Sequence, residues 1–227
     1  MKGVAIVSGG MDSVTMAYFL KRNLHPEVNL RLVSFDYGQR HVKELQTAIT
    51  CAERLEAEHD VINLQMLTKH LAQSGSVLVD QTQAVPHGHY AEESMKSTVV
   101  PNRNAIMLSI ATGIAVADGA EFVAYGVHGG DHFIYPDCRP LFFEEFHRAM
   151  LYGNEGFAVS NFRLMAPFIH QTKADIVHIG ESVGVPWVET WSCYEGGRFH
   201  CGKCGTCVER REAFSLAGVV DPTTYDK

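Results

Sequence analysis

The chain has 227 residues, of which 46% are hydrophobic and 20% charged, and its formal net charge is −7. This is the composition of a globular protein large enough to bury a sizeable core, and it excludes a chain that is disordered throughout. The negative charge disfavours a protein that wraps long nucleic acid, because neutralising phosphates requires a clustered basic surface. Duplex binding is therefore disfavoured, whereas a small anionic substrate is not, and we expect no direct nucleic-acid partner.

The N-terminal residues predict neither a signal peptide nor a membrane anchor. Met1 to Gly3 leads directly into the short apolar run Val4 to Val7, without the longer apolar stretch and cleavage site of a signal peptide. No apolar run approaches the ~20 residues needed to span a bilayer. Six cysteines in such a chain favour a metal site over a disulfide framework. We expect a cytoplasmic protein with no membrane partner.

Apolar patterns along the chain predict strands that alternate with helices. The predicted strands are Lys2 to Val7, Leu30 to Phe35, Asp60 to Leu64 and Glu121 to Tyr125, and the predicted helices are Asp12 to Arg22, Val42 to Ala57, Asn102 to Ala117, Leu141 to Leu151, Lys173 to Val183 and Val208 to Leu216. Such alternation forms a parallel sheet with right-handed crossovers. We expect an α/β fold, a Rossmann-like parallel sheet flanked by helices, in one domain over residues 1–227 that includes a cysteine-rich C-terminal segment, residues 190–227.

Residues Gln65 to Pro101 show few regular signals. A structureless loop of this length inside a compact domain is usually functional or mobile, which suggests an active-site cover that orders on substrate binding. The equally supported alternative is a short helix, Met66 to Gln73, followed by an ordinary surface excursion.

The segment between the first strand and the first helix is Ser8-Gly9-Gly10-Met11-Asp12-Ser13. Two glycines let the backbone approach a phosphate, and the start of a helix offers unpaired amides and the positive end of the helix dipole. The segment is neither a Walker loop nor a complete Rossmann fingerprint. A carboxylate beside phosphates needs a cation between them, so Asp12 indicates Mg²⁺. A capped helix start alone would explain only some of these residues.

These six residues match the SGGxDS signature of the PP-loop ATP pyrophosphatase superfamily. The resemblance implies that residues Ser8, Gly9, Gly10, Met11, Asp12 and Ser13 bind the phosphates of ATP. It also implies that the protein cleaves ATP between the α- and β-phosphates and leaves its substrate adenylated.

Four cysteines lie close together near the C-terminus: Cys193, Cys201, Cys204 and Cys207, with the spacing C-x7-C-x2-C-x2-C. Two thiolates of one Cys-x2-Cys turn can bind the same ion, and four thiolates complete a closed tetrahedral zinc site, which is structural. We favour zinc, while an iron–sulfur cluster and a redox dithiol remain alternatives. We interpret His200 as a neighbour of the site, and Cys51 and Cys138 as buried structural thiols.

Four further motifs narrow the family: Asp36 to His41, Val100 to Asn104, Tyr135 to Arg139, and Trp191 to Tyr194. Together with the loop and the cysteine spacing, they resemble the 7-cyano-7-deazaguanine synthase family over nearly the whole chain. The resemblance implies a ligase that uses ATP to convert 7-carboxy-7-deazaguanine and ammonia into 7-cyano-7-deazaguanine, through an adenylated acid and an adenylated amide, for making nucleosides such as queuosine. It also implies a homodimer. The chain departs from the family at His128, where many members have Asn.

The resemblance and the motif positions together give an expected site. We expect Asp12, Arg103 and Asp131 to be catalytic, with Arg103, at a helix start, also contacting ATP phosphate. The expected substrate contacts are Tyr37, His41, Asn104, Asp131, Tyr135, Asp137 and Arg139. Asp137 is the candidate for the guanine edge, whose paired donors suit a carboxylate. For His41 a proton shuttle is one interpretation, but a bystander role is favoured because the chain has 12 histidines.

Two other functions compete with this interpretation. A PP-loop enzyme that thiolates tRNA or forms lysidine usually has an RNA-binding domain and a basic surface, and the sequence indicates neither. A zinc-ribbon adaptor that only senses ATP would not need the intact set Ser8, Asp12, Arg103 and Asp137.

Overall fold

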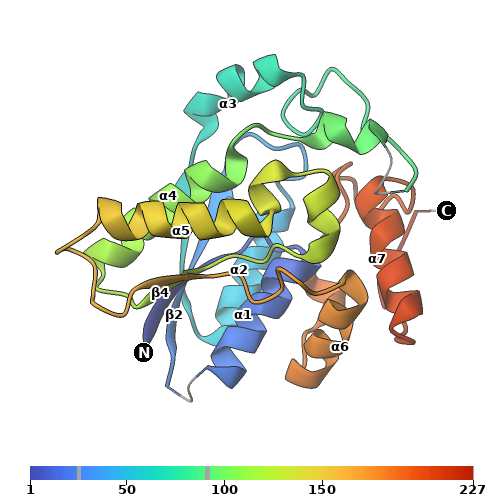
Figure 1. Cartoon of the computed structure of the whole chain (residues 1–227). Helices are drawn as coiled ribbons and strands as arrows, with labels where there is room; N and C mark the ends of the chain where they lie inside the picture. The colour runs from blue at the N-terminus through green and yellow to red at the C-terminus, as the bar shows by residue number, and fades with distance from the viewer. Residues whose placement is uncertain (25–26, 90–92, 227) are drawn as a thin grey trace.

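The computed structural model describes residues 1–24, 27–89 and 93–226 (Figure 1). Its centre is a five-stranded parallel sheet with the order β3-β2-β1-β4-β5. The strands are β1 Lys2–Ile6, β2 Asn29–Asp36, β3 Glu58–Asn63, β4 Phe122–Ala124 and β5 Arg163–Met165. The predicted parallel α/β sheet is confirmed. Sequence analysis missed β5, because three residues at a sheet edge are too few to show a pattern.

Helices cover both faces of this sheet. On one face, α1 (Met11–Asn23), α2 (Glu44–Leu55), α6 (Lys173–Val183) and α7 (Gly205–Leu216) share a core with the sheet. On the other face, α4 (Arg103–Ala117) and α5 (Pro140–Gly153) pack around a second core. Figure 1 shows α4 alongside α5 and α6 next to α7. Burial on both faces accounts for the apolar residues along β2, of which Leu32, Val33 and Phe35 are all buried.

One stretch of the described residues, Met95–Ala117, is long and apolar enough to cross a membrane by length and composition. It ends with α4, whose Leu108, Ala111 and Ala115 are fully buried in the second core. A core helix passes the same test. This finding corrects the expectation that no apolar run approaches that length.

The segment between β3 and α4 contains the short helix of the second interpretation, α3 (Gln65–Leu71), which continues into a 3-10 turn at Ala72–Ser74. The remainder is not an ordinary surface excursion, because Val77, Leu78 and Val79 are buried in the second core. Backbone contact with the rest of the fold adds to this anchoring, since the Arg40 amide donates to the Leu78 carbonyl at 2.9 Å. An active-site cover that orders on substrate binding stays a prediction.

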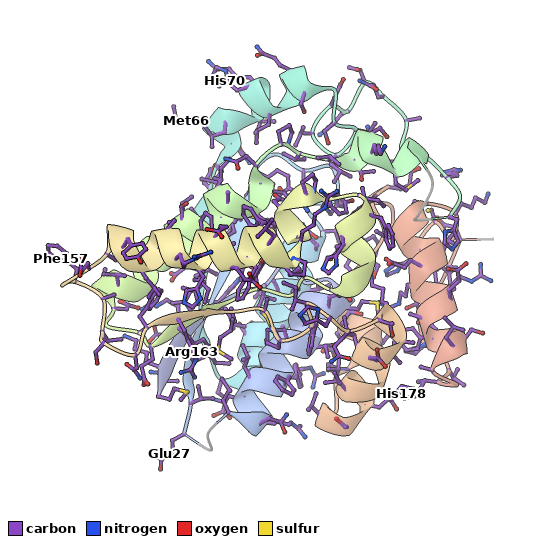
Figure 2. The ribbon with its side chains drawn as sticks, viewed as in Figure 1. Glu27, Met66, His70, Phe157, Arg163 and His178 are labelled. Atoms are coloured by element: carbon purple, nitrogen blue, oxygen red, sulfur yellow. The ribbon has the colours of Figure 1, made fainter. Side chains whose placement is uncertain are left out.

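Side chains at the surface show where apolar groups are left uncovered (Figure 2). Met66 on α3 is 90% exposed and Phe157, after α5, is 83% exposed. Figure 2 shows the two at separate places on the periphery, so they do not form one apolar patch.

Candidate active site and metal centre

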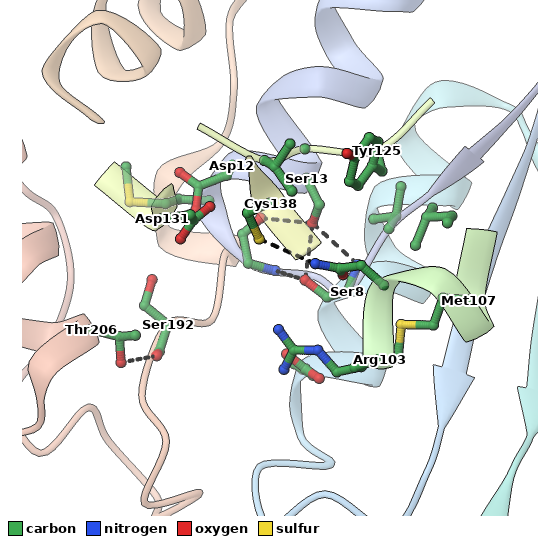
Figure 3. Close-up of a pocket in the computed structure, with 18 of the residues that line it drawn as sticks. Ser8, Asp12, Ser13, Arg103, Met107, Tyr125, Asp131, Cys138, Ser192 and Thr206 are labelled. Atoms are coloured by element: carbon green, nitrogen blue, oxygen red, sulfur yellow. Dashed lines mark hydrogen bonds between the residues drawn. The ribbon is translucent and has the colours of Figure 1, made fainter. Parts of the chain in front are cut away.

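A cavity of about 210 Å³ lies at the carboxyl ends of β1, β2 and β4. This is far larger than a packing void in a protein interior. The residues that follow each strand line it, including Ser8 after β1, Tyr37 after β2 and Tyr125 after β4. Open parallel sheets bind ligands at this edge, so the cavity is the candidate active site (Figure 3).

The loop Ser8 to Ser13 is held in shape by its own hydrogen bonds. Ser8 Oγ accepts from the Gly10 amide at 3.3 Å, and Ser13 Oγ donates to the Gly10 carbonyl at 3.1 Å. Gly9 has φ +92°, and a Cβ there would lie 2.1 Å from the Glu44 carbonyl oxygen, so only glycine fits. Helix α1 begins here without a side-chain cap, which leaves its first amides available to an anion.

Asp12, in the first turn of α1, already has a cationic neighbour. Its Oδ2 lies 3.3 Å from the ammonium of Lys173, while its Oδ1 is buried without a hydrogen-bond partner. Burial by itself lowers the pKa of a lysine, but Asp12 and Glu209 outweigh it and hold the pKa of Lys173 above its ordinary value. Sequence analysis missed Lys173, because it lies far from the loop along the chain.

Arg103, at the start of α4, carries a positive charge into the cavity among tyrosines. Its Nη1 lies 3.4 Å from Tyr37 Oη, and its guanidinium lies 5.8 Å from the centre of the Tyr135 ring. Burial raises the pKa of Tyr37 to about 12, so the phenol stays neutral at physiological pH. A permanent cation beside neutral donors is suited to contact a phosphate or a developing negative charge.

The cavity brings together most of the expected site. The predicted residues that line it are Ser8, Gly10, Met11, Asp12, Ser13, Tyr37, His41, Arg103, Asn104, Asp131 and Tyr135. Gly9, Asp137 and Arg139 do not. Asp137 instead accepts a hydrogen bond from the Asn104 amide at 2.9 Å, and the exposed Arg139 donates to the His132 carbonyl at 3.0 Å. Substrate contacts by these two side chains stay predictions.

Cys138 lines the cavity as a buried thiol. Burial raises its pKa far above the ordinary value, and Asp131 and Asp137 add to the shift. A thiol that stays protonated is a poor nucleophile, which agrees with a structural role.

His41 and Glu44 form a buried pair in the cavity wall that sequence analysis recognised only in part. His41 Nε2 lies 3.4 Å from Glu44 Oε1, which also accepts from Gln39 Nε2 at 3.2 Å. Burial lowers the pKa of His41 to about 3 and raises the pKa of Glu44 to about 8. Both side chains are therefore neutral near pH 7. No sequence motif pointed to Glu44, because its raised pKa arises from burial in the fold.

The raised pKa of Glu44 predicts a pH-dependent stability. Because the folded state holds the proton up to about pH 8 while the unfolded chain releases it near its ordinary 4.5, the stabilisation is complete below about pH 4.5 and is lost as pH rises through 8. We expect Glu44→Gln to raise the free energy of unfolding, relative to the unmodified chain, by about 4 kcal/mol more at pH 8.5 than at pH 5. Urea unfolding at both pH values measures this difference, and equal effects would contradict it.

The four predicted metal ligands converge on one point. The sulfur atoms of Cys193, Cys201, Cys204 and Cys207 all lie within 4.8 Å of one another, and three of these cysteines are fully buried. In a tetrahedral site with metal–sulfur bonds of about 2.3 Å, the sulfurs lie about 3.8 Å apart, so the cluster could hold a metal ion with little adjustment. All six cysteines of the chain are free thiols.

His200 is a neighbour of this cluster, as the sequence suggested. Its Nε2 accepts a hydrogen bond from the Ser192 amide at 3.0 Å, and its ring lies 4.3 Å from that of Trp191. Among the described residues, only thiol sulfurs make up the cluster.

The cysteine-bearing segment also forms one wall of the cavity. Trp191, Ser192 and Thr206 line it, and Thr206 Oγ1 donates to the Ser192 carbonyl at 2.7 Å (Figure 3). The Trp191 amide donates to the Gly9 carbonyl at 2.9 Å. The segment is thus attached to the loop Ser8 to Ser13, so the cysteine cluster supports this wall of the cavity directly.

The sequence as a whole matches one family. Residues 2–218 match the profile of the queuosine biosynthesis protein QueC. The chain belongs to this family. It is 57% identical to the 7-cyano-7-deazaguanine synthase of Rhizobium johnstonii, over all of this chain and 92% of that protein. It is 55% identical to the 7-cyano-7-deazaguanine synthase of Brucella anthropi, over all of this chain and 94% of that protein.

A solved structure agrees on the fold alone. The NMN synthetase from Francisella tularensis superposes with a TM-score of 0.51 at 13% identity, over 96% of this chain and 77% of that one. The sheet with its flanking helices is therefore shared well beyond the family.

Proposed function

We propose that this QueC-family chain is an ATP-dependent ligase that converts 7-carboxy-7-deazaguanine and ammonia into 7-cyano-7-deazaguanine. The observation that carries the proposal is the 57% identity along the entire chain to a protein named 7-cyano-7-deazaguanine synthase. The cavity supports it, since the phosphate loop and Arg103 line one continuous site.

The chemistry explains why a phosphate loop is needed. A carboxylate is a poor electrophile, so attack on the α-phosphate of ATP first converts it into an acyl adenylate and releases pyrophosphate. Ammonia then displaces AMP and forms the amide, with loss of a proton. A second ATP adenylates the amide oxygen and releases pyrophosphate, and loss of AMP and of both amide protons leaves the nitrile. The cavity contains a single phosphate loop, and we infer that it serves both activations.

Each step places negative charge where this chain has positive groups. The amides at the start of α1 and the guanidinium of Arg103 meet the phosphates at the cavity wall. Asp131, on the opposite side of the pocket from Arg103 (Figure 3), and neutral His41 would face the adenylated group or ammonia. Contacts of Asn104, Tyr135 and Tyr37 with the deazaguanine ring complete the proposal.

We propose that the four cysteines bind structural Zn²⁺ and that Asp12 binds Mg²⁺. Four thiolates with no open position are the usual donor set of a structural zinc site. At Asp12, the buried Oδ1 that lacks a hydrogen-bond partner fits a cation, which would offset the negative charge of the phosphates.

We further propose that residues 1–227 form a single PP-loop synthase domain, because the segment 190–227 lines its cavity and cannot be separated from it. A cytoplasmic location agrees with the free thiols, and a protein without direct nucleic-acid contact agrees with the net charge of −7. A homodimer is proposed by analogy with the family. A tRNA-modifying PP-loop enzyme and an ATP-sensing adaptor are the alternatives, and the full-length match to the family disfavours both.

Mass spectrometry of the reaction product tests the proposal. The purified chain with ATP, Mg²⁺, ammonium and 7-carboxy-7-deazaguanine should form a product with the mass of the nitrile. Omission of ammonium should abolish both amide and nitrile, since no other nitrogen donor is present. Consumption of ATP that does not depend on the deazaguanine acid would contradict the proposal.

A further inference from the structure

A cluster of charged side chains, largely buried, lies between the phosphate loop and α7. Lys173, at the start of α6, forms ion pairs with Asp12 of the loop and with Glu209 of α7. The side chains of Lys173 and Glu209 are 12% and 13% exposed. At such burial a charge is retained only when it is paired, and Glu209 is the second carboxylate that holds the ammonium beside Asp12.

His128 lies on a second side of Glu209. The Nδ1 of His128 accepts a hydrogen bond from the Gly130 amide at 3.1 Å, so the neutral ring inferred from this bond carries its proton on Nε2. That Nε2 lies 4.0 Å from Glu209 Oε1 and 3.6 Å from Asp131 Oδ1. Because His128 faces one oxygen of the carboxylate, the other oxygen is directed to Lys173.

The position of Glu209 depends on the cysteine-bearing segment. Helix α7 follows directly from Cys204, contains Cys207 in its first turn, and carries Glu209 in the next. The adjacent Arg210 is fully buried and donates to Thr190 Oγ1 at 2.7 Å and to the Trp187 carbonyl at 3.1 Å. The cysteine cluster and the contacts of Arg210 together fix the position of α7, and therefore the position of the Glu209 carboxylate.

We propose that Glu209 is a positioning residue that holds the Lys173 ammonium against Asp12, where it contacts the phosphates of the bound nucleotide. The identity of the nucleotide as ATP rests on the proposed function. When the α–β bond breaks, negative charge moves onto the leaving pyrophosphate, and an ammonium already fixed at that place stabilises it without reorganisation. Through Glu209, the cysteine segment sets the geometry of this catalytic charge.

The variant Glu209→Gln keeps the shape of the side chain and removes its charge. We expect AMP release to slow at least about tenfold, and the affinity for ATP, measured by calorimetry, to weaken at least about threefold. Metal content and unfolding temperature should stay close to those of the unmodified chain. The matched control is Glu212→Gln on the same helix, where the partly exposed carboxylate pairs with His89, and its activity should be unchanged.

A double-mutant cycle separates positioning from general damage. Lys173→Met should itself slow AMP release, and adding Glu209→Gln to it should cause no further loss, because Glu209 acts through the lysine. Glu209→Asp, which retains the charge, should recover part of the rate and serves in place of Glu209→Gln if that variant does not fold.

The inference would be overturned if Glu209→Gln released AMP within about twofold of the rate of the unmodified chain. It would also be overturned if Glu209→Gln slowed AMP release by the same factor in the Lys173→Met variant as in the unmodified chain. Failure of the proposed function has a different signature. In that case the unmodified chain forms no nitrile. The ATP affinity of Glu209→Gln, compared with that of the unmodified chain, still tests the role of Glu209.

Discussion

Asp12→Asn is expected to reduce ATP-dependent turnover by about 100- to 1000-fold while the fold survives. Asparagine keeps the shape of the side chain and removes the charge that pairs with Lys173 and that we propose binds Mg²⁺. The fold should survive because Lys173 retains Glu209 as a partner, so that no buried charge is left unpaired. Initial rates of AMP formation at saturating ATP measure the effect, and thermal unfolding reports the fold.

The matched control for this substitution is Asp60→Asn. Asp60 pairs with Arg31 at the sheet edge and its side chain is 43% exposed, away from the cavity. Its loss should leave turnover within about twofold, as is usual for exposed ion pairs. Turnover of Asp12→Asn close to that of the control would show that the carboxylate takes no part in catalysis.

Cys204→Ser is expected to have the largest effect on folding. Removing one of four thiolates abolishes a closed metal site, and binding of structural zinc contributes apparent free energies on the order of 10 kcal/mol. Because this segment attaches to the phosphate loop through Trp191 and lines the cavity, we expect most of the soluble protein to be lost. Elemental analysis of the unmodified chain should give about one zinc per chain.

Cys51→Ala provides the comparison, because Cys51 is a buried thiol outside the cluster. It should lower stability by about 1 kcal/mol and leave the metal content unchanged. Normal yield and metal content in Cys204→Ser would contradict the metal centre. A brown protein that contains iron and inorganic sulfide would replace zinc with an iron–sulfur cluster.

The patterns that could be read from the sequence were local ones. The glycine-rich loop had to adopt one conformation, since Gly9 has no room for a Cβ. The spacing of the four cysteines predicted that their thiols converge, and their sulfurs lie within 4.8 Å of one another. The first strand, β1, stood out as a short apolar run of the kind that is buried on both faces of a sheet. Each of these signals lies within a few consecutive residues.

The remainder of the site depends on contacts between distant segments. Lys173 and Glu209 meet Asp12 only after α6 and α7 pack beside α1. Glu44 acquires its raised pKa through burial, which no motif specifies. Conversely, Asp137 belongs to a distinctive motif, yet its carboxylate accepts a hydrogen bond from the backbone amide of Asn104 in α4 instead of lining the cavity. Motifs predict the neighbourhood of a residue more reliably than the direction of its side chain.

The central claim is that one cavity adenylates its substrate twice. Nucleotide chromatography during turnover of the amide intermediate, supplied directly, tests it most directly. Since each activation breaks one α–β bond, we predict one AMP and one pyrophosphate for each nitrile formed from the amide, and about two of each from the acid. Nitrile that forms from the amide without ATP-dependent release of AMP would contradict the second adenylation, and with it the proposed reaction.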